Sequence, residues 1–338
     1  MSHPSPTPFP VTILSGFLGA GKTTLLNRLL HGAPDGARIA VLENELGGVP
    51  VDDTLLADSR AARLDTVLGR TCCEARTEFI EQMRSIAAAT GEFDRLVIET
   101  TGVAHPGMLA HAFLADPVLK RSFRLDGIVT VVDAEHFTAH EGGDGHAREQ
   151  VAYADALVVN KCDLVGPAVL AELTERLRRI NGAARLYTVQ NAQAPVAELF
   201  DLGGFDLARV EQGVTGCAHG TTPAERKTPA AEHRHEHEIE TVAVRTDAAY
   251  DFSRFRTWLE GFIEEHATVL YRAKGVVALA GVDERLVFHG VHGRFQAGLG
   301  RKWGDQPRES RMVFIGCDLD RVVIEDGLVA CRAEEVRS

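Results

Sequence analysis

Short apolar runs alternate with amphipathic stretches through the first two hundred residues of the chain. The runs contain almost no polar residues, which is typical of strands in a parallel sheet that helices cover on both faces. The stretches between them, such as 78–89 and 168–180, repeat apolar residues at helical spacing. This alternation predicts a doubly wound α/β domain over 11–206. Its expected strands are 11–14, 39–42, 96–98, 127–132, 156–159 and 185–189.

The pattern changes after residue 206. Residues 213–238 are polar, contain few large apolar side chains and are rich in His, Ala and Thr, as in an exposed linker. Alternating strand patterns and an amphipathic helix then return. We therefore expect a disordered lead-in at 1–10, the α/β domain at 11–206, a His-containing linker at 207–238 and a smaller α+β domain at 239–330. The last domain is expected to contain strands at 239–244, 276–279, 286–291 and 312–315 and a helix at 252–265.

A phosphate-binding sequence follows the first expected strand. Residues 16–23 match G-x-x-x-x-G-K-[ST], and 24–30 continue with helical spacing. The glycines let backbone N–H groups surround the phosphates, and the helix N-terminus adds its own N–H groups and positive dipole end. Lys22 is expected to neutralise phosphate charge and Thr23 to bind Mg²⁺. The predicted nucleotide-binding residues here are Gly16, Gly19, Ala20, Gly21, Lys22, Thr23 and Thr24.

A guanine-selecting sequence, N-K-x-D, stands at the end of the expected strand 156–159. Ligands of open α/β sheets bind at this edge. The Asp163 carboxylate can accept hydrogen bonds from guanine N1–H and the N2 amino group, which adenine does not offer in that geometry. Asn160 and Lys161 are expected to brace the loop and to pack on the ring. The motif favours GTP over ATP as the ligand.

An acidic residue between these two motifs is a candidate for catalysis. The apolar strand 96–98 ends in Glu99, and Gly102 follows three residues later. A carboxylate at this place can hold Mg²⁺ through water or orient the attacking water, and the Gly102 N–H can meet the γ-phosphate. Lys22 and Glu99 are therefore the expected catalytic residues. The alternative is that Glu99 is only the polar end of a strand.

Bulk composition narrows the class of protein further. The 338 residues, 45% hydrophobic and 25% charged, suffice for two domains with their own cores. The net charge is −12, so the protein has no excess of positive charge to attract nucleic acid or an anionic membrane, and neither is expected as a partner. The start has no basic segment followed by an apolar one, so no signal peptide is expected. Six scattered cysteines do not make a disulfide framework, which favours the cytoplasm.

Together the motifs resemble those of the CobW-type metallochaperone GTPases, and most nearly their YjiA-like branch. The phosphate loop, the E-N-E-x-G run at 43–47 and E-T-T-G at 99–102 closely resemble the characteristic motifs of this family. The second domain carries similar matches: R-x-K-G at 272–275, W-G-D at 303–305 and M-V-F-I-G at 312–316. The resemblance covers 11–325 and implies a P-loop GTPase domain followed by a CobW-type C-terminal domain.

The resemblance also implies a function. Members of the family bind GTP, hydrolyse it slowly, and bind zinc or another transition metal for delivery to a client protein or for cobalamin synthesis. We therefore expect a GTP-hydrolysing metallochaperone that uses Mg²⁺ and carries zinc. A GTP-dependent protein-binding switch that has lost metal transfer is the alternative. A nucleotide kinase is disfavoured by the N-K-x-D motif. The client remains open, as does the choice between a monomer and a homodimer.

The hallmark metal motif of the family is altered in this chain. G-C-x-C-C reads Gly69-Arg70-Thr71-Cys72-Cys73 here, so an arginine replaces the first cysteine. In addition, Gly48 stands where relatives commonly have a glutamate. The remaining donors, Glu43, Cys72 and Cys73, make three of the four that tetrahedral zinc needs, and Glu74 or water can supply another. The alternative is that the two cysteines pack as small apolar groups.

A second candidate metal site lies in the expected linker. His233, His235 and His237 project on one side of an extended segment, with His219 upstream. Imidazole binds zinc, nickel and copper, and relatives often carry His-rich stretches between the two domains. The alternative is a solvated polar linker. His105 and His111 stand alone in the sequence, and structural roles are expected for them.

Overall fold

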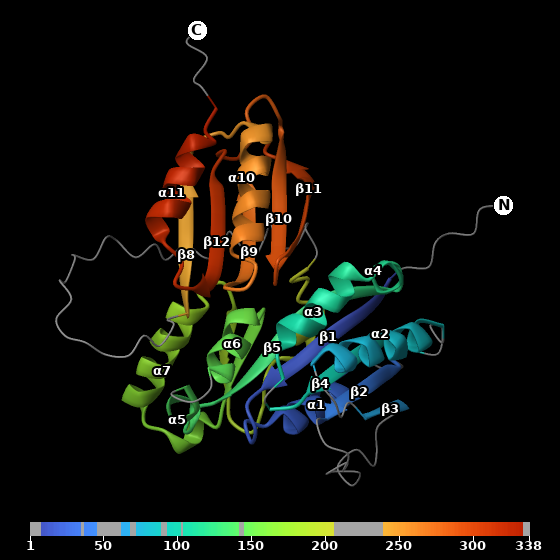
Figure 1. Ribbon diagram of the computed structural model, residues 1–338. Helices are drawn as coiled ribbons and strands as arrows, with labels where there is room; N and C mark the ends of the chain where they lie inside the picture. The colour runs from blue at the N-terminus through green and yellow to red at the C-terminus, as the bar shows by residue number, and fades with distance from the viewer. Residues whose placement is uncertain are drawn as a thin grey trace. The chain divides into compact units, whose positions relative to one another are not determined.

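The computed structural model describes residues 8–34, 37–45, 62–67, 72–88, 93–102, 104–141, 145–205 and 239–333 (Figure 1). The chain divides into two compact units. One holds Met1–Arg178 and Ala184–Asp206, and the other holds Arg179–Ala183 and Leu207–Ser338. Most of the expected lead-in and the whole expected linker at 207–238 lie outside the described residues.

The first unit is built on a seven-stranded sheet in which every described pairing is parallel. The strand order is β3-β2-β4-β1-β5-β6-β7, so the chain moves to one side of β1 and then to the other, as a doubly wound sheet does. The expected α/β fold is therefore confirmed. Its strands are β1 (Phe9–Gly16), β2 (Ile39–Glu45), β3 (Ala62–Val67), β4 (Arg95–Thr100), β5 (Phe123–Asp133), β6 (Ala156–Asn160) and β7 (Arg185–Thr188).

Helices cover both faces of this sheet. Val129 and Val131 of β5 belong to the same buried cluster as Leu25, Leu26 and Leu29 of α1. Thr130 lies between those two valines and donates a hydrogen bond to the Gln150 carbonyl of α6. Because successive side chains of a strand point to opposite faces, α1 and α6 cover opposite faces of β5. The helices are α1 (Lys22–His31), α2 (Cys72–Ala88), α3 (Pro106–Ala115), α4 (Pro117–Ser122), α5 (Phe137–Glu141), α6 (His146–Tyr153), α7 (Pro167–Ile180) and α8 (Val196–Leu199), with a 3₁₀ turn at Cys162–Leu164.

The second unit is an antiparallel sheet packed against two helices, as the α+β expectation requires. The strand order is β11-β10-β9-β12-β8. Phe255 of α10, Ile324 of α11 and Phe288 and Phe314 of the sheet share one buried cluster. The elements are β8 (Ile239–Thr246), α10 (Phe252–Glu265), β9 (Leu270–Val277), β10 (Glu284–Val291), β11 (Arg294–Lys302), β12 (Ser310–Cys317) and α11 (Arg321–Ala330).

Two strands, β3 and β11, were not predicted from the sequence. Each forms an edge of its sheet. Edge strands pack on fewer neighbours, so their sequences need fewer apolar residues. Residues 294–302 include three basic side chains, and most positions of β11 are exposed or half-buried. None of the described helices is long and apolar enough to cross a bilayer.

Candidate nucleotide-binding and metal sites

The loop between β1 and α1 has the backbone that a phosphate cradle requires. Gly16, Gly19 and Gly21 all have positive φ angles. At Gly21 φ is +103°, and a Cβ there would lie 2.5 Å from Asn160 Nδ2, so only glycine fits. Ala20 is fully buried, whereas Thr24 is exposed on α1. The loop therefore brings backbone N–H groups next to a helix N-terminus, which together suit an anion, although the Ala20 N–H already donates to the Phe17 carbonyl.

Lys22, Thr23 and Glu99 meet where α1 begins and β4 ends. The Thr23 hydroxyl donates to Glu99 Oε1 at 2.9 Å. Lys22 is 8% exposed, and its Nζ donates to the carbonyl of Phe17 in the same loop at 3.2 Å. Burial lowers the pKa of Lys22, and the nearby Glu99 carboxylate opposes that effect. The structure thus brings together the two expected catalytic residues and the expected Mg²⁺ ligand.

The loop after β4 lies directly against the phosphate loop. A Cβ on Gly102 would lie 2.6 Å from the Leu18 backbone nitrogen and 2.9 Å from its Cα, so the contact requires glycine. On its other side, Gln150 Nε2 of α6 donates to the carbonyls of Gly102 at 3.0 Å and Ala104 at 3.2 Å. Gly102 is therefore held between the phosphate loop and α6.

Asn160 joins three loops at the end of β6. Its side chain is buried; Nδ2 donates to the Ala20 carbonyl at 3.0 Å, and Oδ1 accepts from the Ala192 amide at 2.7 Å. The Ala20 contact joins the N-K-x-D loop to the phosphate loop, and the Ala192 contact joins it to the loop after β7. Asn160 therefore sets the distance between the phosphate end and the base end of the site.

The rest of the N-K-x-D loop presents a carboxylate to solvent. Lys161 has a positive φ of 61°, and its Nζ donates to Asp133 Oδ2 at 2.7 Å. Burial alone would raise the pKa of Asp133, but hydrogen bonds from Lys161, the Glu135 amide and His136 outweigh it and lower that pKa. Asp133 thus stays ionised and fixes Lys161. Asp163 is exposed and makes no hydrogen bond or ion pair within the described residues, so its carboxylate is available to a ligand.

Three residues of this site were missed by sequence reasoning. Asp133 ends β5, next to the strand that ends in Asn160, so a polar residue after an apolar run was a usable signal. Gln150 and Ala192 carried none, because one acts from the middle of a helix and the other through its backbone amide. Long-range contacts of this kind do not follow from local sequence.

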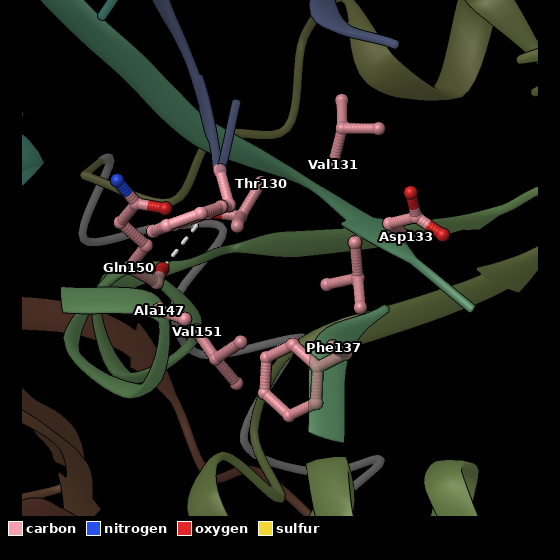
Figure 2. A pocket seen from close by; sticks show the side chains of 9 residues that line it. Thr130, Val131, Asp133, Phe137, Ala147, Gln150 and Val151 are labelled. Atoms are coloured by element: carbon pink, nitrogen blue, oxygen red, sulfur yellow. Dashed lines mark hydrogen bonds between the residues drawn. The ribbon is translucent and has the colours of Figure 1, made fainter. Parts of the chain in front are cut away.

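A small cavity of about 10 Å³, room for about one water molecule, lies between β5 and α6. Figure 2 shows Val151 and Phe137 near β5, with Thr130 hydrogen-bonded to the Gln150 carbonyl. The remaining lining comes from Phe17 of the phosphate loop and from residues 131–133 and 147. Most of these side chains are apolar, so the pocket lacks the donors that a triphosphate needs. It shares Phe17, Asp133 and Gln150 with the site described above and is too small to hold a nucleotide.

The candidate metal ligands are placed by backbone alone. Glu43 of β2 is the register partner of Glu99 in β4, and Glu45 is the partner of Val67 at the end of β3. Cys72 and Cys73 begin α2, five and six residues after that strand end. β2 and β3 end at the same edge of the sheet, and the chain passes from the end of β3 to the start of α2. The start of α2 therefore follows the sheet edge at which β2 ends. The side chains of Glu43, Cys72 and Cys73 lie outside the described part of the structure, as do His233, His235 and His237 entirely.

Comparison with known proteins agrees with this geometry. The family model for the CobW/HypB/UreG nucleotide-binding domain matches residues 10–188, and that for the cobalamin synthesis protein cobW C-terminal domain matches 239–332. The zinc chaperone YjiA of Escherichia coli is 37% identical over 96% of this chain and 99% of its own. The zinc chaperone CobW of Pseudomonas aeruginosa is 30% identical over 94% of this chain and 90% of its own.

A solved structure extends the similarity to the fold. The crystal structure of the Zn(II)-bound YjiA GTPase from E. coli superposes with a TM-score of 0.73 and 32% identity. It covers 97% of this chain and 100% of that one. The similarity thus spans both units and includes the phosphate loop, the loop after β4 and the N-K-x-D loop. This chain belongs to the CobW/HypB/UreG family and carries its CobW-type C-terminal domain.

Proposed function

We propose that this protein is a GTPase that carries a transition metal, zinc first, and releases it to a client protein according to the state of its nucleotide. One observation carries the proposal: Glu43, a candidate metal ligand, is the register partner of Glu99, which accepts the Thr23 hydrogen bond. Neighbouring strands of a sheet lie about 4.8 Å apart, so the backbone of this candidate metal ligand lies beside the backbone of a residue of the nucleotide site.

The residues at the phosphate end suit Mg²⁺ and a triphosphate. A hydroxyl and a carboxylate are the oxygen donors that Mg²⁺ prefers, so Thr23 would hold it directly and Glu99 through water. Bound there, Mg²⁺ would neutralise charge on the β- and γ-phosphates. Lys22 would exchange its bond to the Phe17 carbonyl for one to a phosphate oxygen, which returns a counter-charge to a buried ammonium. Gly19, Ala20, Gly21 and Thr24 would supply backbone N–H groups, and Gly102 would contact the γ-phosphate.

The residues at the base end suit guanine. The Asp163 carboxylate would accept two hydrogen bonds from the base, on a loop that Asn160 and the Lys161–Asp133 ion pair hold in place. An ionised acceptor strengthens both bonds and penalises adenine, which leaves the carboxylate facing an acceptor. GTP is therefore the proposed substrate.

The proposal that the protein binds a metal is supported by its relatives and by the residues that could donate ligand atoms. Two relatives are named zinc chaperones, and the solved structure of one of them, the YjiA GTPase, is Zn(II)-bound. In this chain Cys72, Cys73 and Glu43 would bind the metal, with water as the fourth ligand. Three protein ligands plus water make an open site, which suits a metal that has to be released. The thiols of this proposed site are expected to remain reduced in the cytoplasm.

Movement of β2 would couple nucleotide binding to metal binding. A triphosphate that draws Thr23 and Glu99 toward Mg²⁺ would alter the end of β4 and, through strand pairing, the position of Glu43 on β2. The metal ligand set would then differ between the GTP-bound and GDP-bound states. An order-of-magnitude change in metal affinity corresponds to about 1.4 kcal/mol, which one altered ligand supplies.

One observation favours a second candidate function. Arg70 replaces the first cysteine of the family motif and places a permanent positive charge near the incoming cation. A protein that kept GTP binding and lost the metal site would be a GTP-dependent protein-binding switch. Such a switch would retain Asp163 and Lys22 function and show no dependence on Cys72 or Cys73.

The deciding experiment measures Zn²⁺ affinity of the full chain by competition with a chromophoric chelator. Three proteins are compared: the wild type, Cys72→Ser/Cys73→Ser, and a variant with His233, His235 and His237 changed to alanine. The proposal predicts a tight site that the cysteine variant loses and the histidine variant keeps. Binding that disappears only with the histidines would support the switch instead.

A further inference from the structure

Three side chains of types that can ligate a metal, from two distant segments, converge outside the nucleotide site. His105 immediately precedes α3, and His146 and Glu149 lie in the first turn of α6. One ligand atom from each residue lies within 4.8 Å of the others. His105 Nδ1 is 2.6 Å from Glu149 Oε2, and the two imidazole rings are 4.7 Å apart between centroids. We refer to these three residues as the His-His-Glu cluster.

The cluster is held in a form that an ion can occupy. All three residues are half-buried, with 39% of the His105 side chain and 24% of the Glu149 side chain exposed. An ion can therefore reach the ligand atoms from solvent, and partial burial strengthens its attraction to the carboxylate. His146 and Glu149 are three residues apart on a helix, so they project from the same face of α6. Only small side-chain rotations would be needed to direct three donors to one point.

The donor set selects the class of metal. Two imidazole nitrogens and one carboxylate oxygen, with a position left for water, form a three-ligand set that zinc proteins use. Imidazole also suits nickel and copper, whereas Mg²⁺ and Ca²⁺ prefer sites made of oxygen alone. The other such group among the described residues is Asp133, Glu135 and His136. It is a poorer site, because the Lys161 ammonium is already 2.7 Å from Asp133 Oδ2.

The cluster lies beside a segment that contacts the phosphate loop. Gln150 follows Glu149 and donates to the carbonyls of Gly102 and Ala104, and His105 follows Ala104. The same turn of α6 thus already contacts both ends of the segment that leads from Gly102 to α3. An ion shared by His105, His146 and Glu149 would add bonds between that segment and α6. The segment also carries Gly102, which lies against Leu18 of the phosphate loop.

We propose that His105, His146 and Glu149 form a second transition-metal site, of the zinc type, which fixes the loop after β4 to α6 when occupied. The metal binding itself stands apart from the function proposed above, and only its effect on the nucleotide rests on that function. Occupancy would restrict the loop whose Gly102 N–H follows the γ-phosphate, so zinc here changes affinity for a GTP analogue. We expect this site to regulate nucleotide binding rather than to deliver metal, because its ligands come from the loop after β4 and from α6, which flank the expected position of the phosphates.

The test isolates the cluster from the other candidate donors. The background is the full chain with Cys72→Ser, Cys73→Ser and alanine at positions 233, 235 and 237. In this background, Co²⁺ titration followed by visible absorption and Zn²⁺ competition with a chelator are measured. The same measurements are made for His105→Asn, His146→Asn and Glu149→Gln, and for His111→Asn in α3 as the matched control.

We expect one Zn²⁺ per chain in the background protein. Each cluster variant should weaken that binding by at least about 10- to 100-fold, which is the loss typical even for residues that only support a ligand. His111→Asn should leave it unchanged. The Co²⁺ complex should show visible bands of a four- or five-coordinate nitrogen and oxygen site that each cluster variant removes. In the background protein, Zn²⁺ should also change the affinity for a non-hydrolysable GTP analogue, and in the cluster variants it should not.

Equal Zn²⁺ affinity in the background protein, the three cluster variants and the His111 control would overturn the proposal. If one variant does not bind GDP and is judged unfolded, the other two still decide, because they change different segments. Failure of the proposed metal carrier is a separate result. It would appear as an equal number of bound Zn²⁺ ions per chain in the unmodified protein and in Cys72→Ser/Cys73→Ser, whatever the cluster variants show.

Discussion

The contact between Gly102 and the phosphate loop leads to a quantitative prediction for Gly102→Ala. The added Cβ would lie 2.6 Å from the Leu18 nitrogen and 2.9 Å from its Cα. Both atoms belong to the backbone of the loop that is proposed to cradle the phosphates, so no side-chain rotation relieves the overlap. The loop after β4, the phosphate loop or both have to move.

The size of that movement follows from the geometry. Ordinary contact begins near 3.4 Å, so the Leu18 nitrogen has to recede by about 0.8 Å. A misplacement of about 1 Å in a catalytic constellation costs about 100-fold in rate, or about 2.7 kcal/mol of activation free energy. We therefore expect GTP hydrolysis by Gly102→Ala to fall by about two orders of magnitude.

The assay is single-turnover release of phosphate from radiolabelled GTP, followed over hours because the intrinsic rate is expected to be slow. The matched control is Gly261→Ala in α10, an exposed position where a Cβ meets no atom within 4 Å. Binding of a fluorescent GDP reports whether each variant is folded. If Gly102→Ala binds GDP and hydrolyses GTP at the wild-type rate, the close approach of the two loops is irrelevant to hydrolysis and the reasoning is refuted.

Three further predictions follow from single side chains. Asp163→Asn should reduce the preference for GDP over ADP, measured by competition with fluorescent GDP, by about 2–4 kcal/mol, because the base loses two charge-assisted hydrogen bonds. Gly261→Ala should stabilise the chain to urea by about 0.5–1 kcal/mol, because glycine is a poor residue inside a helix. Asp116→Ala should destabilise it to urea by about 1 kcal/mol at pH 7, because Asp116 caps α4 by accepting from the amides of Val118 and Leu119.

The Asp116 prediction has a defined pH dependence. Burial alone would raise the pKa of Asp116, but hydrogen bonds from the Leu119 amide, Arg84 and the Val118 amide outweigh it and lower that pKa. A carboxyl group with a lowered folded pKa stabilises the protein above its unfolded pKa, near 4, and loses that contribution as the pH falls through the folded value. The difference between wild type and Asp116→Ala should therefore be full at pH 7 and shrink below about pH 4.

Each of these predictions has an outcome that contradicts it. An unchanged preference for GDP over ADP in Asp163→Asn would remove the base assignment. A loss of stability in Gly261→Ala would mean that α10 does not tolerate a side chain at that position. A stability difference at Asp116 that persists at acid pH would show that the carboxylate is not the group responsible.

Much of the fold and the nucleotide site could be predicted because both are encoded locally. Apolar runs and helical spacing located six of the seven strands of the first sheet, and the missed strand β3 is an edge strand in which polar residues interrupt the apolar ones. Lys22 and Thr23 belong to one contiguous motif. Thr23 and Glu99, 76 residues apart, were both expected near Mg²⁺, and the Thr23 hydroxyl donates to Glu99.

What could not be predicted depends on contacts between distant segments. His105 looked isolated along the chain, yet α6 brings His146 and Glu149 to it. The partners of Asn160 are likewise a loop carbonyl 140 residues earlier and a backbone amide 32 residues later. Residue types and spacing within one segment carry no information on such pairs, because the fold as a whole decides which loops meet.

The central claim is that nucleotide and metal affect each other, and one pair of titrations tests it. The Zn²⁺ affinity of the full chain is measured with and without a non-hydrolysable Mg–GTP analogue, and the affinity for that analogue is measured with and without Zn²⁺. Thermodynamic linkage requires the same factor in both directions, and couplings of this kind are typically about 5- to 150-fold. The account predicts two equal factors of at least about fivefold. Two affinities that do not respond to the other ligand would contradict it.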